Sequence, residues 1–299
     1  MQTYRVNPGA GIDGLRLETT DIPSPGPYEV LVRVKAVSLN SRELMIILHN
    51  RYPLPVKQNG IPVSDGAGEV IAVGAGVTRV RVGDRVAAAL FPDWIDGQFN
   101  WERARQIGGS IDGMLTEYAL IPESAAVHLP EGLSFEQAAT LPCAAVTAWN
   151  AFSGGLPLLP GQTVLTLGSG SVSLFALQLA QLFGARVIAT TSSDNRAIRL
   201  KALGAAAVIN YRATPDWNVP VRDLTGGRGV DLVVEVLLGD IQTASAQSAY
   251  SYPWCSVRSR GAMSCYYTSW EQCRTTLSGI GGNCIRSPYY RPSPPEYRK

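Results

Sequence analysis

The chain has 299 residues, of which 45% are apolar and 17% are charged, so its composition favours a packed globular protein and excludes wholesale disorder. Its formal net charge is +2 and it has no basic stretch with interleaved aromatic residues, which argues against nucleic acid as a partner. No apolar run approaches the roughly 18–20 residues of a membrane span, and the first residues, MQTYRVNPGAG, contain no apolar signal core. These features predict a cytoplasmic protein, and the length predicts about two domains.

Cysteine and histidine are too scarce to form a zinc site in most of the chain. The histidines are His49 and His128, and of the five cysteines only Cys143 precedes residue 241. No CxxC or HxxxH pair occurs in that stretch, whereas zinc sites use closely spaced Cys and His ligands. We therefore expect no metal there, and we expect Cys143 to be a small core residue and not a nucleophile.

Residues 1–150 are predicted to form a β-rich domain. Three segments alternate apolar and polar residues and are rich in β-branched side chains, as strands are: residues 28–37, 67–73 and 77–88. Glycines between them supply turns, and short punctuated strands of this kind are typical of a compact, partly open barrel. A short helix is expected over 41–49 and a helical stretch over 134–153, where Ser134 and Gln137 have the spacing of a capping box.

Residues 151–240 are predicted to form part of a parallel α/β sheet. Continuous apolar runs replace the alternation, which is typical of strands buried on both faces. The expected strands are 163–168, 186–192, 206–210 and 230–236, and the expected helices are 171–184, 194–204 and 214–227. Gly184 is expected to end the first helix, and Pro220 to shorten the third. Strands that alternate with helices in this order form parallel, right-handed crossovers.

The turn after the first of these strands has the composition of a phosphate site. It contains the small residues Gly168, Ser169, Gly170 and Ser171, followed by Val172. Small residues allow the backbone to approach a pyrophosphate, and the helix N-terminus adds N–H groups and a partial positive charge. A lone GxG also makes ordinary tight turns, but between a strand and a helix it predicts dinucleotide binding, with the Ser171 side chain slightly crowding the phosphate.

The end of the second strand predicts which dinucleotide is bound. An acidic residue there would bind the ribose 2′-hydroxyl of NAD, whereas this chain reads TSSDNR over residues 191–196. Hydroxyls such as that of Ser192, together with the Arg196 guanidinium, suit the 2′-phosphate of NADP(H). Asp194 argues against this choice, but we interpret it as the N-cap of the next helix. The alternative for Arg196 is a solvated charge on the helix surface.

The composition changes abruptly after residue 240. From residue 241 to 299, Leu, Ile and Val together number five, Phe and Asp are absent, and the formal charge is +5. Neither helical nor strand periodicity emerges, and the Pro-rich end favours an extended or disordered chain, so this tail is expected to be poorly ordered. Its four cysteines could indicate a metal site or a disulfide frame. A third interpretation is an altered reading frame or a retained intron.

Seven segments give residues 1 to about 240 a resemblance to the medium-chain dehydrogenase/reductase superfamily, and in particular to its zinc-free, quinone-oxidoreductase-like branch. The segments are YEVLVRVKAVSLNSREL (28–44), IPVSDGAGEV (61–70), GVTRVRVGDRV (76–86), DGMLTEYALIP (112–122), ATLPCAAVTAWNAF (139–152), GSGSVSLFALQLAQLFGARVIATTSS (168–193) and KALGAAAVINY (201–211). The resemblance implies an α/β fold in which a GroES-like catalytic domain precedes a Rossmann domain.

The resemblance implies roles for single residues where they match the family pattern. Zinc-dependent members place a cysteine where Asn40 stands and a His-Glu pair at residues 64 and 65, which are Ser and Asp here. Zinc-free members line the nicotinamide pocket at the positions of Asn40 and Tyr52, and they touch the nicotinamide end at Thr147. NADPH-using relatives contact the adenosine phosphate at the position of Tyr211.

Each catalytic candidate also has an ordinary structural interpretation. Asn40 could cap the helix at 41–49, Tyr52 could be a packed loop aromatic, and Thr147 could bond to its own helix. The chain departs from the family pattern at Ser171, where glycine is usual, and at Glu43, where aspartate is usual.

The resemblance implies an NADPH-dependent oxidoreductase that transfers hydride to a small-molecule enone, quinone or carbonyl without zinc, with Tyr52, Asn40 or water donating a hydrogen bond to the substrate oxygen. The Rossmann sheet is expected to be truncated after its fourth strand, because residues 241–299 lack apolar runs for a fifth and sixth. The fourth strand would then be a bare edge, and a family-type homodimer would lack its usual edge strand. The alternatives are a non-catalytic NADP-binding protein and an inactive product of a disrupted reading frame.

Overall fold

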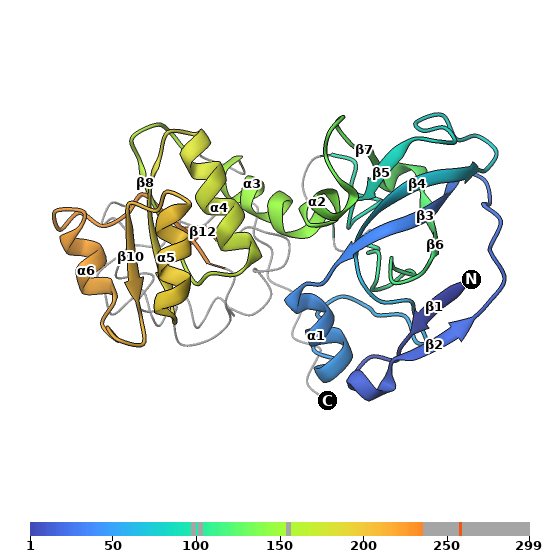
Figure 1. The fold of residues 1–299 in the computed structure, drawn as a ribbon, viewed down its shortest axis with the longest axis horizontal. Helices are drawn as coiled ribbons and strands as arrows, with labels where there is room; N and C mark the ends of the chain where they lie inside the picture. The colour runs from blue at the N-terminus through green and yellow to red at the C-terminus, as the bar shows by residue number, and fades with distance from the viewer. Residues whose placement is uncertain (97–99, 101–103, 154–156, 236–256, 259–299) are drawn as a thin grey trace. The chain divides into compact units, whose positions relative to one another are not determined.

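The computed structural model describes residues 1–96, 100, 104–153, 157–235 and 257–258. The chain divides between Asn150 and Ala151 into two compact units. Figure 1 shows the order of the elements by colour from the N-terminus to the C-terminus. Within the described ranges, no helix combines the length and the apolar character that a membrane crossing requires.

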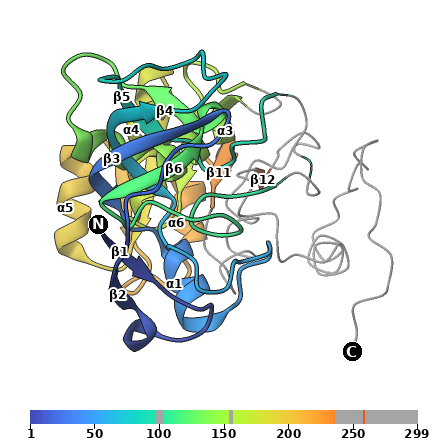
Figure 2. The same cartoon turned by 90° about the vertical axis from the view of Figure 1, so that its right-hand side faces the viewer.

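A five-stranded antiparallel sheet, in the order β6-β3-β4-β5-β7, forms most of the first unit. Its strands are β3 (Glu29–Ser38), β4 (Asp65–Val73), β5 (Arg85–Ala88), β6 (Tyr118–Pro122) and β7 (Ala126–His128). The long strand β3 runs between β4 and β6 (Figure 2). Other elements here are β1 (Gln2–Arg5), β2 (Arg16–Thr19), η1 (Ile12–Gly14), η3 (Glu123–Ala125) and α1 (Ser41–His49). This sheet confirms the predicted β-rich first domain.

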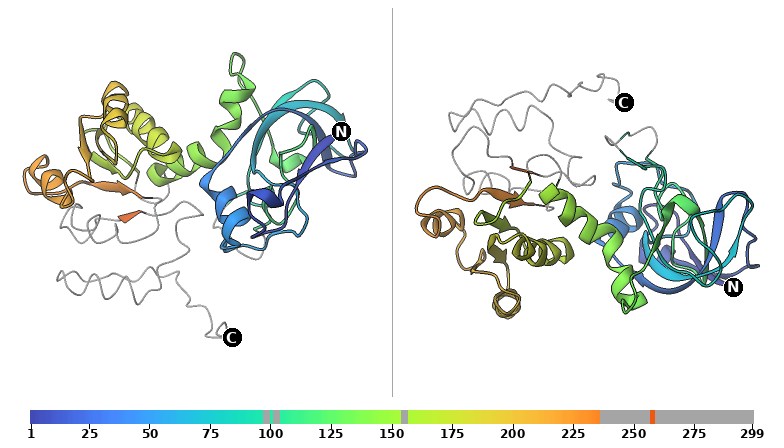
Figure 3. Two further views of the ribbon diagram at one scale, coloured as in Figure 1. Left: turned by 60° about the horizontal axis from the view of Figure 1, so that its bottom comes forward. Right: turned by 90° about the horizontal axis from the view of Figure 1, so that it is seen from above.

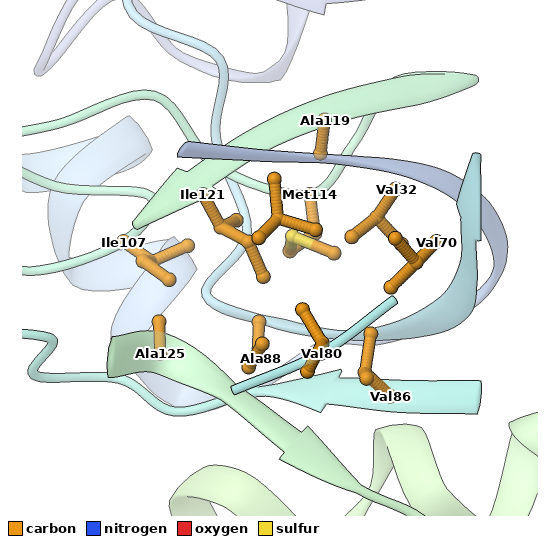
Figure 4. Close-up of a cluster of buried hydrophobic side chains, with 12 residues drawn as sticks. Val32, Val70, Val80, Val86, Ala88, Ile107, Met114, Ala119, Ile121 and Ala125 are labelled. Atoms are coloured by element: carbon orange, nitrogen blue, oxygen red, sulfur yellow. The ribbon is translucent and has the colours of Figure 1, made fainter. Parts of the chain in front are cut away.

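Alternating side chains from the sheet strands form one apolar core. Val32, Val70, Val86 and Ile121 point into it from four strands, and Met114 fills the space between them (Figure 4). The alternation that predicted the strands is therefore the alternation that fills this core. Glycine is required where the backbones approach closely, since a Cβ at Gly68 would lie 2.2 Å from the carbonyl oxygen of Arg33.

Two predicted elements of the first unit are shorter or more broken than expected. Of the predicted strand over 77–88, only Arg85–Ala88 is a strand, because a turn precedes it in which Gly83 has a φ of 92°. The predicted helical stretch over 134–153 consists of α2 (Phe135–Ala139), a π-helical segment η4 (Leu141–Ala145) and α3 (Val146–Ser153). A proline near the start of η4 lacks the N–H of a regular helix. The capping box at Ser134 and Gln137 is confirmed, with hydrogen bonds of 3.2 and 3.0 Å.

A parallel sheet in the order β10-β9-β8-β11-β12 forms the centre of the second unit. Its elements are β8 (Thr163–Thr166), α4 (Ser171–Leu182), β9 (Arg186–Thr191), α5 (Asp194–Ala202), β10 (Ala207–Asn210), α6 (Asn218–Asp223), β11 (Leu232–Val234) and β12 (Val257–Arg258). The alternation of strands and helices confirms the predicted Rossmann-like topology, and α4 and α5 lie along the sheet in Figure 1.

Three local predictions for this unit have clear outcomes. Gly184 has a φ of 72° and follows Phe183, the C-cap residue of α4, which confirms its role at the helix end. The helix that contains Pro220 is only six residues long, as predicted. Asp194 is not the N-cap of α5; Ser193 is the N-cap and Asp194 is the first helical residue.

The tail contributes a strand that its composition did not predict. Residues 257 and 258 form β12, which pairs in parallel with residues 233 and 234 of β11 (Figure 3). Strand β11 is therefore not the bare edge that we expected, because two backbone residues of the tail pair with it. Backbone hydrogen bonds depend little on side-chain type, so hydrophobic patterning does not reveal so short a strand.

Helix α4 offers a matched test of packing in the second unit. Leu177 is 0% exposed, whereas Leu182 on the same helix is 83% exposed. We expect Leu177→Ala to reduce the free energy of unfolding of this unit by about 2–5 kcal/mol, because it removes apolar contacts and leaves a cavity. Leu182→Ala should change it by less than about 0.5 kcal/mol. Denaturant unfolding followed by circular dichroism compares the two, and equal effects would contradict the placement of α4.

Candidate active site and nucleotide-binding turn

A buried arginine organises a polar cluster in the first unit. Arg42, on α1, is 1% exposed. Its guanidinium donates to Glu43 Oε1 at 3.1 Å, to the carbonyl oxygen of Gly108 at 3.1 Å and to Gln106 Oε1 at 3.0 Å. Gln106 in turn donates to the carbonyl oxygen of Pro55 at 3.2 Å. These acceptors offset the cost of burying the guanidinium, which would be several kcal/mol for an unpaired charge.

Asp65 accepts hydrogen bonds from three sides at the start of β4, where it is 0% exposed. The Asn40 side-chain amide donates to Oδ2 at 3.1 Å and the backbone N–H of Cys143 donates to the same oxygen at 3.2 Å. The Ser64 hydroxyl donates to Oδ1 at 2.9 Å. Burial nevertheless raises the pKa of Asp65 to about 6, because these hydrogen bonds only partly offset the loss of water.

Glu43 connects the arginine to this aspartate. Its Oε1 accepts from Arg42 and also from the backbone N–H of Ser64 at 3.3 Å, while its Oε2 accepts from the backbone N–H of Asn40 at 2.7 Å. The last contact is half of a capping box at the start of α1, which confirms that Asn40 is the N-cap residue. The helix cap and the polar cluster therefore share one carboxylate.

Tyr52 packs under the buried guanidinium, whose carbon lies 4.7 Å from the ring centroid. The ring is 9% exposed, and the hydroxyl makes no well-formed hydrogen bond within the described part of the chain, although Arg42 lies close enough to act on its pKa. Burial raises the pKa of Tyr52 more than Arg42 lowers it, so the phenol stays protonated at neutral pH. A protonated phenol can donate a hydrogen bond to a ligand oxygen.

The structure thus brings Asn40 and Tyr52, two of the three catalytic candidates, to the two ends of one polar cluster. Thr147 is connected to it through the main chain, since its hydroxyl donates to the carbonyl oxygen of Cys143 at 2.7 Å. This is the bond to its own helix that we gave as the alternative interpretation. Cys143 is buried, and burial raises the pKa of its thiol to about 12, which agrees with its expected role as a core residue.

Three members of this cluster were not predicted from the sequence: Arg42, Gln106, and Asp65 as the acceptor of three hydrogen bonds. The available signal is the pair of opposite charges, Arg42 and Glu43, at the start of the mostly apolar helix SRELMIILH, because a buried charge requires partners. The partners themselves come from loops far along the chain, and their pairing depends on the tertiary fold.

The predicted nucleotide-binding residues lie in the second unit, at the turn between β8 and α4. Gly168 has a φ of 77°, which favours glycine, and its N–H donates to the Thr190 hydroxyl at 3.1 Å. The Thr191 hydroxyl donates to the Ser169 hydroxyl at 3.3 Å, so the turn is held against the end of β9. Gly170 is the N-cap residue of α4. The side chain of Ser171 is exposed, and that of Val172 is half-buried.

The N–H groups of the first turn of α4 have no intrahelical acceptor, as in any α-helix. Open space surrounds Gly170, because a Cβ built there would meet nothing within 4 Å. The Ser173 hydroxyl, which could compete for a ligand, donates inward to the carbonyl oxygen of Leu167 at 2.7 Å. These residues therefore fit the phosphates of a dinucleotide, and the 12-residue helix adds a favourable dipole.

The residues predicted to choose the dinucleotide lie at the ends of β9 and β10. Ser192 is half-buried and Arg196 is exposed on α5. Tyr211 follows β10, is half-buried against the sheet core, and its N–H donates to the carbonyl oxygen of Thr191 at 3.0 Å. Arg212 comes next and is exposed, and no sequence motif had indicated it.

Two family models match the two units. Residues 26–131 match the alcohol dehydrogenase GroES-like domain, and residues 171–251 match the model described as zinc-binding dehydrogenase. A zinc-type alcohol dehydrogenase-like protein of Schizosaccharomyces pombe is 45% identical over 231 residues, which are 76% of this chain and 66% of that protein. A chloroplastic quinone oxidoreductase of Triphysaria versicolor is 37% identical over 70% of this chain and 60% of its own.

Solved structures agree with this relationship. A putative alcohol dehydrogenase from Sinorhizobium meliloti superimposes with a TM-score of 0.77 at 38% identity, over 83% of this chain and 73% of its own. A quinone oxidoreductase from Pseudomonas syringae gives a TM-score of 0.70 at 30% identity, over 83% of this chain and 70% of its own. The chain therefore belongs to the medium-chain dehydrogenase/reductase superfamily, which confirms the resemblance. It spans 66% and 60% of the two curated relatives named above.

A different family model matches the tail. Residues 231–299 match a family described as a protein of unknown function, DUF3551. The segment thus resembles sequences found in other proteins, and its composition does not require an altered reading frame. Apart from β12, the tail and its four cysteines lie outside the described residues.

The cluster in the first unit does not fit zinc. Asn40 offers an amide and Ser64 a hydroxyl where zinc-dependent members of the family place Cys and His, and the Asn40 nitrogen is already bonded to Asp65. Structural and catalytic zinc sites are built from thiolates, imidazoles and carboxylates. Within the residues that the structure describes, no group of three or more such side chains has an arrangement that could hold a metal ion.

The buried carboxylate predicts a pH dependence of stability. Because the pKa of Asp65 rises from 3.8 to about 6 on folding, the native state binds this proton more tightly than the unfolded state does. Stability should therefore fall as pH rises from about 4 to about 6, by on the order of 3 kcal/mol for this group. Denaturant unfolding at several pH values should show a smaller decline for Asp65→Asn, whereas the exposed Asp13→Asn should retain the wild-type profile. Parallel profiles for wild type and Asp65→Asn would refute this assignment.

Proposed function

We propose that this protein is an NADP(H)-dependent oxidoreductase that transfers hydride to an enone, quinone or carbonyl substrate without zinc. The observation that carries the proposal is the open turn Gly168–Ser171 at the N-terminus of α4, in a parallel sheet of the dehydrogenase type. Relatives named alcohol dehydrogenase and quinone oxidoreductase support the reaction class. The nicotinamide supplies the hydride when the cofactor is bound.

The backbone of the turn would hold the cofactor diphosphate. The N–H groups of Ser171 and Val172 lie in the first turn of α4, where they are available to phosphate oxygens. Ser169 and Gly170 complete the turn without a bulky side chain. The exposed Ser171 side chain leaves the helix N-terminus accessible, so the departure from glycine is compatible with binding.

Ser192, Arg196 and Tyr211 would favour NADP(H) over NAD(H). A guanidinium pairs with phosphate oxygens through two parallel hydrogen bonds, and a hydroxyl adds a third donor. The exposed Arg196 makes no ion pair within the described part of the chain, so it is available to a 2′-phosphate. The proposal predicts a preference for the phosphorylated cofactor.

Asn40 and Tyr52 would bind the oxygen of the substrate that gains electron density as hydride arrives. The Tyr52 phenol remains protonated because it is buried, and Asn40 retains a second amide hydrogen after donating one to Asp65. Donors of this kind stabilise a developing oxyanion without a metal ion. The buried salt bridge between Arg42 and Glu43 fixes the ring and the helix cap on which these donors stand.

A non-catalytic NADP-binding protein is the second candidate function. It is favoured by one observation: residues 231–299 match a family other than the dehydrogenases. Calorimetric titration with NADPH, followed by turnover assays with a quinone and an enone, separates the two candidates. Binding with turnover supports the reductase, and binding without turnover supports the second candidate.

The substrate-side proposal predicts a specific loss of activity. Tyr52→Phe keeps the ring under Arg42 but removes the hydroxyl, and Asn40→Ser keeps a capping oxygen but removes the amide. We expect each to lower kcat by about 10-fold or more, because an oxyanion donor is lost, while the Kd for NADPH stays within about twofold. Steady-state kinetics measure this, with the exposed Tyr4→Phe as the control. Unchanged kcat in both variants would remove these residues from the mechanism.

The cofactor-side proposal predicts a difference between two arginines of α5. Arg196→Ala should weaken NADPH binding by about 10-fold and leave NADH binding unchanged, since only NADPH carries the 2′-phosphate. Arg199→Ala removes an exposed guanidinium from the same helix and should affect neither. Calorimetry gives the four dissociation constants, one for each of the two variants with each of the two cofactors. Equal losses for both arginines would indicate a general charge effect and not a phosphate contact.

A further inference from the structure

The carboxylate that argues against NADP(H) is already bound to another side chain. Asp194, at the start of α5, is the acidic residue near the end of β9. Its Oδ1 accepts a hydrogen bond of 2.8 Å from the side-chain amide of Asn210, the last residue of β10. Asp194 is therefore not the helix cap that the sequence suggested, but an exposed carboxylate with one oxygen bound to an amide.

Asn210 is itself held in one orientation. Its side-chain oxygen accepts from the backbone N–H of Arg212 at 3.0 Å, which leaves the amide nitrogen for Asp194. Its backbone oxygen accepts from the N–H groups of Ala213 and Thr214 at 3.1 and 2.9 Å. With these bonds the amide connects the end of β10 to the start of α5.

The same short segment carries the groups that favour phosphate. Tyr211 is bonded through its N–H to Thr191 at the end of β9, and the exposed Arg212 follows it. Across the amide, α5 carries the exposed Arg196. A carboxylate that is free to turn here can accept from ribose hydroxyls and approach a 2′-phosphate, whereas one held by an amide donor keeps its charge but is restrained from both.

We infer that Asn210 is a specificity-determining residue, which favours the 2′-phosphorylated ribose by holding the Asp194 carboxylate. This inference rests on the proposed nucleotide site at Gly168–Ser171 and deepens it. Asn210 acts through Asp194 and not by touching the ligand, so its effect must depend on whether Asp194 is present. That dependence distinguishes it from a residue with a general structural role.

The experiment uses the full chain and two probes that differ only in the 2′-phosphate, adenosine 2′,5′-bisphosphate and adenosine 5′-monophosphate. Calorimetry gives both Kd values for wild type, Asn210→Ala, Asp194→Ala and the double variant. The ratio of the two Kd values measures the preference, and thermal unfolding of each variant verifies folding. Neither probe contains nicotinamide, so the result is independent of turnover.

We expect Asn210→Ala to reduce the preference for the bisphosphate by about threefold or more, because the released carboxylate repels the phosphate. Asp194→Ala should retain the preference, and adding Asn210→Ala to it should change the ratio by less than about 1.5-fold. An unchanged ratio in Asn210→Ala, or an equal loss with and without Asp194, would overturn the inference while leaving the nucleotide site intact. A wild-type protein that binds neither probe would overturn the proposed cofactor site itself, and one that prefers the monophosphate would place Asp194 on the ribose.

Discussion

The fold of the first unit buries two carboxylates, those of Glu43 and Asp65, together with one guanidinium, that of Arg42. Arg42 neutralises Glu43 directly, and Asp65 has no cation within hydrogen-bond distance among the described residues, so it relies on three neutral donors. Burial raises the pKa of Asp65, and neutral donors only partly offset that rise because they stabilise a carboxylate less than a cation does. Each donor is also part of another element: a helix cap, a strand start and a π-helical segment. The cluster thus fixes the positions of three elements around the catalytic candidates.

The proposed ligand site of the second unit differs from the polar cluster of the first, because it consists of backbone N–H groups and not of side chains. The turn at Gly168 requires a left-handed residue, and hydroxyls of Thr190 and Thr191 hold the turn from the neighbouring strand. These two threonine side chains therefore hold the turn in place, while the N–H groups at the start of α4 remain available to the ligand. A site of this kind tolerates exchange of Gly for Ser at residue 171 more easily than the polar cluster tolerates exchange of Asp65, where three donors would lose their acceptor.

Sequence predicted the elements well where the chain alternates or runs apolar over many residues, as in 28–37 and 186–192. It failed where a turn or a local hydrogen bond decides the outcome, as at Gly83, at the break before Leu141 and at Asp194. The turn Gly168–Ser171 was predictable because its residues are contiguous. The cluster around Arg42 was only partly predictable, because its members come from α1, β4 and two loops. The pairing of β12 depends on backbone alone and leaves no pattern in the side chains.

The main chain of Cys143 donates its N–H to Asp65, and its carbonyl oxygen accepts from Thr147 one turn later. Helix α3 begins beside these contacts and continues past Asn150, where the first unit ends. The π-helical segment η4 therefore connects the helix at the end of the first unit to the buried carboxylate of Asp65 through main-chain hydrogen bonds.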